Sequence, residues 1–97
     1  MENIYICSPM LSKDEKMNRI FAESAAKMVK ERGDNPIICW DVYDNMEVKD
    51  KLNYEEYVFK PMKKCTSVWL TNHDPNDVIC SIVLDFAEKK GIRILYG

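Results

Sequence analysis

The sequence predicts an α/β protein built as a small doubly wound, three-layer sandwich around a four-stranded parallel sheet. Four short apolar runs alternate with three helix-like segments along the chain, and this alternation is typical of a parallel sheet covered by helices. Right-handed crossovers then place helices on both faces, as in flavodoxin-like or Rossmann-like proteins. The chain has 97 residues without a repeat or a linker, so residues 1–97 are expected to form one domain.

The first strand and the first helix are expected in the first third of the chain. Residues 3–7 (Asn-Ile-Tyr-Ile-Cys) are an apolar run and predict the first strand. Ser12 and Glu15 have the spacing of a capping box, which opens a helix. Apolar residues then recur at helical spacing as far as residue 28. Gly33 is the expected end of this helix, because glycine adopts the left-handed conformation that stops a helix.

The middle of the chain predicts a second strand, a loop and a second helix. Residues 36–40 (Pro-Ile-Ile-Cys-Trp) read as a largely buried strand. Residues 41–53 are polar without a clear period, and a loop of that length is often functional. Asn53 and Glu56 have the spacing to open a helix. Pro61 is expected to kink or restart it, because proline lacks the amide donor of a helix interior.

The last third of the chain predicts a third strand, a third helix and a final strand. The third strand is expected over residues 67–71. Residues 74–77 (Asp-Pro-Asn-Asp) are a helix-start signal, with Asp74 as the cap and proline in the first turn. Gly91 is the expected end of that helix, and residues 92–96 are expected to form the last strand.

Composition and cysteine spacing exclude several classes of function. Lys and Arg number 14 against 16 Asp and Glu, a formal net charge of −2, which argues against duplex nucleic acid as a partner. No apolar run approaches the roughly 20 residues that span a bilayer, and no signal peptide is recognisable. Cys7, Cys39, Cys65 and Cys80 form no C-x-x-C pair, so we expect core packing and no metal or cofactor. A cytoplasmic protein without a membrane partner is the expectation.

The predicted topology also places a ligand site. Doubly wound sheets bind ligands outside the carboxyl ends of their strands, where the strand order reverses. The segments expected at that edge are residues 8–12, 40–53 and 71–77. Within them, Trp40 offers a ring face on which a base could stack, although a tryptophan there also suits packing.

Several segments resemble the nucleoside 2-deoxyribosyltransferase-like superfamily, especially the short phage and bacterial domains of unknown function related to it. Ile4-Tyr5-Ile6-Cys7-Ser8-Pro9-Met10 resembles the opening strand and loop of that superfamily. Further matching segments are residues 36–38, 64–69 and 87–91, in the same order over nearly the whole chain. The resemblance implies a phage or bacterial source and a homo-oligomer, since many relatives assemble with pockets completed across the interface.

The resemblance also identifies what this chain lacks. Members of the superfamily break an N-glycosidic bond with a glutamate on the last helix, which attacks the anomeric carbon. Tyr5 matches the tyrosine that supports this nucleophile, and Asp77 matches an aspartate at the start of the last helix. Val83 stands at the position of the nucleophile, and valine can neither attack nor ionise. Two further positions depart from the pattern of the superfamily: Thr66 stands where an aspartate is expected, and Ile79 stands where a glycine is usual.

The resulting hypothesis is a domain that binds a nucleoside or nucleotide, and sequesters or senses a nucleotide signal, without the usual glycosyl transfer. Binding is expected rather than catalysis. The small molecule is expected to contact residues of the first strand, of the three edge segments and of the start of the last helix. These candidate ligand-binding residues are Tyr5, Ser8, Pro9, Met10, Trp40, Asp41 and Asp77.

Three alternatives stay open at this point. A nucleoside hydrolase or deoxyribosyltransferase could use a relocated carboxylate, with Asp77, Asp41 and Asp44 as candidates. A phosphotransferase-system subunit of the small IIB type would use Cys7, which ends the first strand. However, the loop after Cys7 contains no glycine, and Pro9 removes one of the amide donors that a phosphate loop needs. The third alternative is a small protein that only docks on a larger partner.

Overall fold

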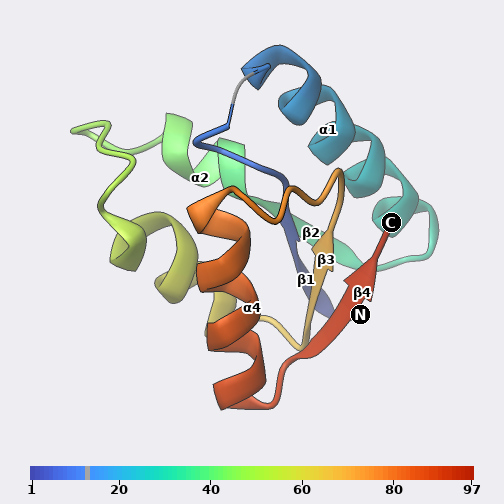
Figure 1. Cartoon of the computed structure of the whole chain (residues 1–97). Coiled ribbons are helices and arrows are strands. Elements are labelled where there is room, and N and C mark those ends of the chain that lie inside the picture. Colours follow the sequence, from blue (N-terminus) through green and yellow to red (C-terminus); the bar gives the residue numbers. More distant parts are fainter. Residues whose placement is uncertain (13) are drawn as a thin grey trace.

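Four parallel strands form one sheet in the order β2-β1-β3-β4 in the computed structural model, which describes residues 1–12 and 14–97 (Figure 1). Ile6 of β1 is in register with Ile38 of β2 and with Trp69 of β3. The strands therefore end close together at one edge, the carboxyl edge of the sheet. The predicted α/β class and the four-stranded parallel sheet are confirmed. The strands are β1 (Asn3–Cys7), β2 (Asn35–Ile38), β3 (Ser67–Leu70) and β4 (Arg93–Tyr96).

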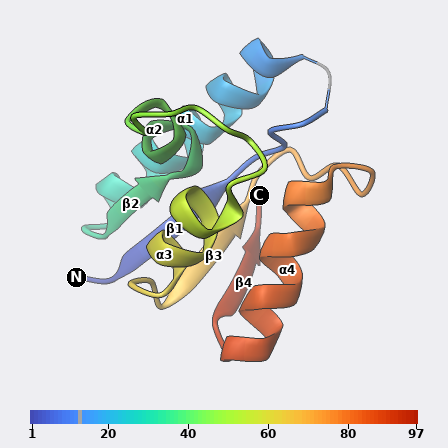
Figure 2. The same ribbon diagram turned by 90° about the vertical axis from the view of Figure 1, so that its left-hand side faces the viewer.

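Helices cover the sheet on both faces, as Figures 1 and 2 show from two sides. One face carries α1 (Glu15–Glu31), which packs on β1 and β2. The other face carries the segments between β2 and β3 together with the helix that precedes β4. The chain leaves β1 towards β2, but then crosses back over β1 to reach β3, so right-handed crossovers put these helices on opposite faces. The segments of the second face are α2 (Cys39–Asp44), the π-helical segment η1 (Glu55–Phe59), α3 (Lys60–Met62) and α4 (Val78–Lys90).

The start of α1 differs from the predicted capping box. Asp14 is the N-cap, and its carboxylate accepts a hydrogen bond from the amide of Met17 at 3.3 Å. The Ser12 hydroxyl lies elsewhere, where it accepts a hydrogen bond from the side-chain amide of Asn18. The capping box was therefore wrong, because a neighbouring aspartate competes for the same helix end. Gly33, with φ of 84°, confirms the predicted stop.

The second strand is shorter than predicted, and the loop after it begins later. Strand β2 ends at Ile38, and Cys39 and Trp40 already belong to α2. The expected loop over residues 41–53 is corrected accordingly, because α2 extends to Asp44. Cys39 and Trp40 are both buried, and a short buried apolar run has the same sequence signal in a strand and in a helix.

The helix predicted after the loop is present in an altered form. Glu55–Phe59 is π-helical, and Tyr54 rather than Asn53 is its N-cap, without a side-chain hydrogen bond. Pro61 lies in the first turn of α3, where a missing amide donor costs little. The predicted restart of the helix at this proline is confirmed.

The last helix begins and ends close to the predicted residues. Asp77 is its N-cap, and one carboxylate oxygen accepts from the amide of Ile79 at 2.9 Å. Asp74, the expected cap, instead accepts from the amide of Asn76 in the turn just before the helix. Gly91 has φ of 69° and confirms the predicted stop.

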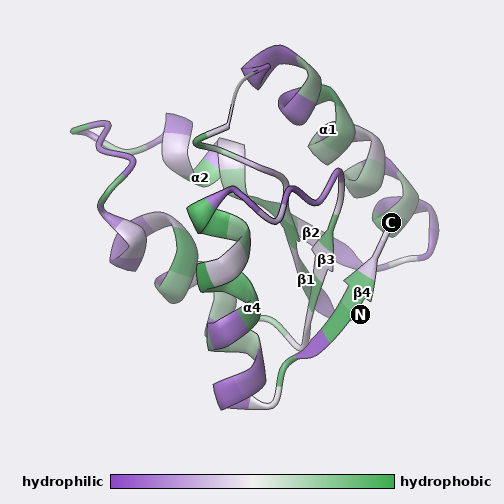
Figure 3. Cartoon of the chain, in the orientation of Figure 1, coloured by the Kyte–Doolittle hydropathy of each residue, from purple (hydrophilic) through white to green (hydrophobic). Residues whose placement is uncertain are grey.

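The buried core and the polar loop between β3 and α4 differ sharply in their side chains. The strands are largely apolar, whereas the loop between β3 and α4 is hydrophilic (Figure 3). Val68 and Leu70 of β3 and Val83 and Ala87 of α4 are essentially inaccessible to solvent. Among residues 1–12 and 14–97, no helix has the length and apolar character needed to cross a membrane.

Candidate functional site

A hollow of about 300 Å³ opens at the carboxyl edge, between the loop after β1 and the loop after β3. In the order β2-β1-β3-β4, the connection after β1 leads to one edge of the sheet, and the connection after β3 leads to the opposite edge. The hollow therefore lies at the topological switch point, where doubly wound sheets bind ligands. Its lining residues are Pro9, Ser12, Asp14, Asn18, Asn72, His73, Asp74 and Pro75.

Side-chain amides join the two loops across the floor of the hollow. The Asn72 amide donates to the side-chain oxygen of Asn18 at 2.7 Å. Asn72 itself adopts φ of 54°, a left-handed conformation that asparagine tolerates better than most residues. The Asn18 amide in turn donates to the Ser12 hydroxyl at 3.3 Å. This chain of hydrogen bonds holds polar groups from both loops in fixed positions around the opening.

Two carboxylates are the charged groups among the described residues that line the hollow. Asp14 caps α1 and Asp74 closes the turn before α4, each using one carboxylate oxygen. In both residues the second oxygen has no hydrogen-bond donor among residues 1–12 and 14–97. Carboxylates are pure acceptors, so the lining is suited to a ligand that brings hydroxyl or amine donors.

An aromatic surface lies at the rim of the hollow. The His73 ring stacks on the Tyr96 ring at the end of β4, with the ring centres 6.2 Å apart and the planes 9° apart. Tyr96 is 66% exposed. A flat, accessible aromatic pair of this kind can accept a further ring by stacking.

Tyr5, one of the predicted binding residues, does not line the hollow. Its side chain is fully buried, and its hydroxyl donates to the carbonyl of Tyr57 at 2.6 Å. Burial raises the pKa of Tyr5 well above its usual range, so the phenol stays protonated and keeps this bond. The hydrogen bond ties β1 to η1 across the sheet face.

Ser8 and Trp40 are both buried and hydrogen-bond to each other. The Ser8 hydroxyl accepts from the Trp40 indole N–H at 2.9 Å and donates to the carbonyl of Asn18 at 2.8 Å. The guanidinium of Arg19 lies over the indole ring, 4.2 Å from its centroid. The polar edge of Trp40 is thus occupied, and a cation already stacks on its ring.

Asp77 acts as a structural tie between the two sides of the hollow. Its carboxylate accepts from the amides of Leu11 and Ser12, at 2.8 and 2.7 Å, in addition to capping α4. Asp77 is only 2% exposed. This single side chain fixes the loop after β1 against the start of α4.

The remaining predicted residues are scattered. Pro9 lines the hollow, Met10 is buried beside it, and Asp41 is exposed on α2 without lining it. Two of the three predicted edge segments, residues 8–12 and 71–77, do meet at the hollow. Asn72, His73 and Asp74 of the second segment were not among the predicted binding residues, because nothing in a single sequence distinguishes a lining asparagine from any other loop asparagine.

Four of the positions required by the catalytic alternatives are closed or occupied, whereas Asp41 is exposed outside the hollow. Val83 is fully buried in the core, and Asp77 is held by three amides. Asp44 forms two hydrogen bonds with the guanidinium of Arg19. Cys7 is fully buried, and hydrogen bonding with Cys39 and Cys80 together with burial raises its pKa. That environment keeps Cys7 a thiol, whereas a nucleophilic cysteine must be an accessible thiolate.

Arg19 should contribute to stability through its carboxylate partners, and the contribution should depend on pH. Hydrogen bonds from Arg19 lower the pKa of Asp44 and of Glu15 below their ordinary values of 3.8 and 4.5. Because folding lowers both pKa values, the stabilisation is complete above about pH 5 and is lost as the pH falls through the lowered values. Both carboxylates are substantially exposed, so we expect Arg19→Met to cost about 1 kcal/mol at pH 7. Urea unfolding at pH 7 and pH 3 measures this, and an equal cost at both pH values would contradict it.

Comparison with protein-family models, with curated proteins and with solved structures finds no match to this chain.

Proposed function

We propose that this chain binds a nucleoside in the hollow between the loops after β1 and β3, and that it does so without transferring the glycosyl group. The observation that carries the proposal is the position of the hollow together with its polar lining. It lies at the switch point of a doubly wound sheet. Side chains from both loops surround it, so a bound molecule would contact both halves of the fold.

The charge of the lining favours a nucleoside over a nucleotide. Asp14 and Asp74 each have a carboxylate oxygen available to ribose hydroxyls, which are good donors to carboxylates. A phosphate beside these two carboxylates would be repelled. No Lys or Arg lines the hollow among the described residues. The proposal therefore narrows the sequence-based hypothesis from nucleosides or nucleotides to uncharged nucleosides.

The rim supplies a surface for the base, and the two positions at which the resemblance expects catalytic groups, Val83 and Asp77, are closed or occupied. The stacked rings of His73 and Tyr96 offer an exposed aromatic face. Any purine or pyrimidine base can stack on such a face. Val83 is enclosed in the core and Asp77 already accepts three hydrogen bonds. These environments support recognition of an intact nucleoside, in a role such as sequestering or sensing it.

Calorimetric titration tests the proposal. Purine and pyrimidine nucleosides are titrated into the protein beside their 5′-monophosphates, with thermal unfolding as a second readout. We expect at least one nucleoside to bind and raise Tm, and its monophosphate to bind about tenfold more weakly or worse, a difference of about 1.4 kcal/mol. We also expect Asp74→Asn to weaken nucleoside binding about tenfold, because a carboxylate acceptor becomes a neutral amide. Asp41→Asn, an equal change on an exposed carboxylate outside the hollow, is the matched control.

Two results would overturn the proposal. One is that no nucleoside binds, or that monophosphates bind as tightly as nucleosides. The other is release of free base by the wild-type protein with loss of that activity in Asp77→Asn, which would establish the hydrolase or transferase alternative instead.

A further inference from the structure

Three of the four cysteines meet at the carboxyl edge of the sheet. Cys7 is the last residue of β1, Cys39 begins α2, and Cys80 lies in the first turn of α4. Ile6 and Ile38 are partners in the register of β1 and β2, so Cys7 and Cys39, the next residues along, are neighbours. Hydrogen bonds join the Cys7 thiol to Cys39 and to Cys80. Cys7 is therefore the centre of a cluster of three thiols.

One member of the cluster, Cys39, lies in the interior beside two tyrosines. Side chains alternate along a strand, so Cys7 lies on the same face of the sheet as Tyr5, whose hydroxyl donates to the carbonyl of Tyr57 in η1. Burial first, and the nearby charged form of Cys39 among other groups, raise the pKa of both tyrosines. Cys39 is thus surrounded by core residues on the face that carries η1.

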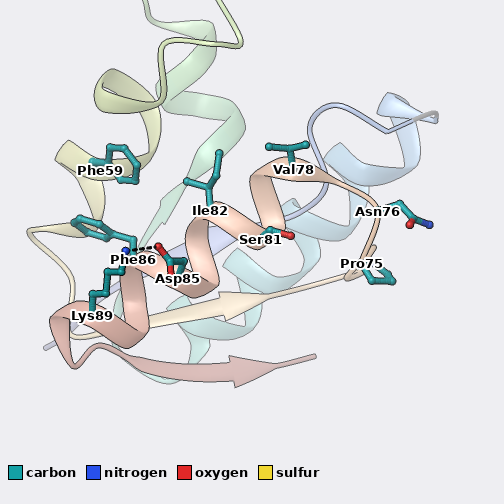
Figure 4. Close-up of a pocket in the computed structure, with 9 residues that line it drawn as sticks. All are labelled: Phe59, Pro75, Asn76, Val78, Ser81, Ile82, Asp85, Phe86 and Lys89. Atoms are coloured by element: carbon teal, nitrogen blue, oxygen red, sulfur yellow. Dashed lines mark ion pairs between the residues drawn. The ribbon is translucent and has the colours of Figure 1, made fainter.

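The surroundings of Cys80 are different, because the turn before α4 lies against its sulfur. The backbone amide of Asp74 in that turn donates a hydrogen bond to the Cys80 sulfur. Residues 72, 73, 75 and 76 of the turn are exposed, and Figure 4 shows the side chains of Pro75 and Asn76 directed away from the helix. The residues labelled there line an open hollow of about 680 Å³ on the outer side of α4. Cys80 therefore lies at the boundary between the core and an exposed turn.

The hydrogen bond between Cys7 and Cys80 favours a thiolate at Cys80. This bond is the main cause that lowers the pKa of Cys80 below its ordinary value of 9.0, and the Asp74 amide acts in the same direction against the opposing effect of burial. Hydrogen bonding with Cys39 and Cys80, together with burial, raises the pKa of Cys7, so Cys7 keeps its proton. A thiolate in contact with a protonated thiol is an arrangement from which disulfides form, because the thiolate reacts with an oxidant and the second thiol resolves the product.

We propose that Cys7 and Cys80 form a reversible disulfide when the protein meets a peroxide, and that Cys39 takes no part. The Cys80 thiolate attacks one peroxide oxygen, the O–O bond breaks, and Cys80 becomes a sulfenic acid while hydroxide leaves. The Cys7 sulfur then attacks the Cys80 sulfur and expels the sulfenic oxygen, which takes the Cys7 proton and leaves as water. In total the two thiols lose two electrons and two protons, and hydrogen peroxide gains them to become two waters.

The reaction requires a local opening of the turn before α4. Both thiols are closed to solvent, and exposed turns open at a lower free energy than core elements. Asp77 caps α4 and binds the loop after β1. We therefore expect Asp77→Ala to be oxidised about fivefold faster than the wild-type protein or more, because a first turn without its cap opens more often. Asp41→Ala is the control, and equal rates for the wild-type protein and Asp77→Ala would contradict the opening step.

Peptide mapping tests the pairing itself. The wild-type protein is treated with hydrogen peroxide, its free thiols are alkylated under denaturing conditions, and the digested protein is analysed by mass spectrometry. We expect the Cys7 and Cys80 peptides to be linked within one chain, Cys39 and Cys65 to be alkylated, and dithiothreitol to release the link. Four alkylated cysteines after prolonged treatment, a link between Cys7 and Cys39, or a link between two chains would overturn the proposal.

Alanine variants separate the proposed pair from the other thiols. Cys80→Ala should form no disulfide, whereas Cys39→Ala should form it as the wild-type protein does. Cys65→Ala is the matched control, because it removes a buried thiol that bonds to the carbonyl of Pro61 outside the cluster. Circular dichroism checks that each variant is folded. A disulfide in Cys80→Ala, or none in Cys39→Ala, would show that Cys80 is not the partner of Cys7, whatever the outcome of the nucleoside titrations.

Discussion

Replacing Asp77 by alanine is expected to lower the free energy of unfolding by about 3 kcal/mol. The Asp77 carboxylate accepts from the amides of Leu11, Ser12 and Ile79 while only 2% exposed. Hydrogen bonds to a charged acceptor are worth roughly 1.5–3 kcal/mol each, and loss of a helix cap costs about 1 kcal/mol. We place the total below the roughly 4 kcal/mol that is the smallest sum of these terms, because the Leu11 and Ser12 amides lie near the surface and can take up water.

The same substitution is expected to abolish nucleoside binding. Without Asp77 the loop after β1 is no longer held against α4, so the two sides of the hollow lose their fixed separation. Urea unfolding and calorimetric titration measure the two effects. Asp41→Ala removes an exposed carboxylate and is the control, with an expected change within about 0.5 kcal/mol. If Asp77→Ala unfolds within 1 kcal/mol of the wild-type protein, the carboxylate does not tie the loops as described.

Placing a glutamate at Val83, where the family resemblance expects the nucleophile, should destabilise the protein instead of producing an enzyme. Val83 is fully buried among the core residues of α4 and the sheet. An unpaired carboxylate in such a place costs at least about 4 kcal/mol, enough to unfold many small domains. We expect Val83→Glu to be largely unfolded at pH 7 and to release no base from nucleosides.

The pH dependence of Val83→Glu distinguishes buried charge from lost packing. Burial raises the pKa of a carboxyl in the folded state, so the variant loses stability as the pH rises above the ordinary value of about 4.3. Val83→Gln, which cannot ionise, should show a penalty independent of pH. Val48→Glu makes the same change at a 77% exposed position and should unfold like the wild-type protein. A stable Val83→Glu would mean that this position opens on a pocket, and it would revive the enzymatic alternative.

The elements with strong local signals could be predicted from sequence. Gly33 and Gly91 end α1 and α4 because both adopt a positive φ, a conformation for which glycine pays no steric cost. Pro61 restarts a helix because it has no amide to donate. The four strands follow from short apolar runs between such signals. The parallel orientation of the strands follows from the alternation of strands and helices, because a helix between two strands lets the chain return and run in the same direction.

Two of the errors fall where two residues compete for one local role. Asp14 replaces Ser12 as the cap of α1, and Asp77 replaces Asp74 as the cap of α4. Each competing residue is an equally good cap by type. The choice between them depends on where the neighbouring loop lies: Asp77 alone is placed to accept from Leu11 and Ser12 as well.

The sequence by itself determined the fold class, the positions of most helices and strands, and the two loop segments that meet at the carboxyl edge. These depend on local periodicity and on backbone chemistry, which each segment carries in its own residues. Only the tertiary structure decided the role of each side chain there. It buries Tyr5, Ser8, Trp40 and Asp77 with hydrogen-bond partners from other parts of the chain, and leaves Asp14, Asn18, Asn72 and Asp74 to line the hollow. Whether a polar group faces a ligand or another part of the chain depends on partners far apart in sequence, such as Leu11 and Asp77, and only folding brings these together.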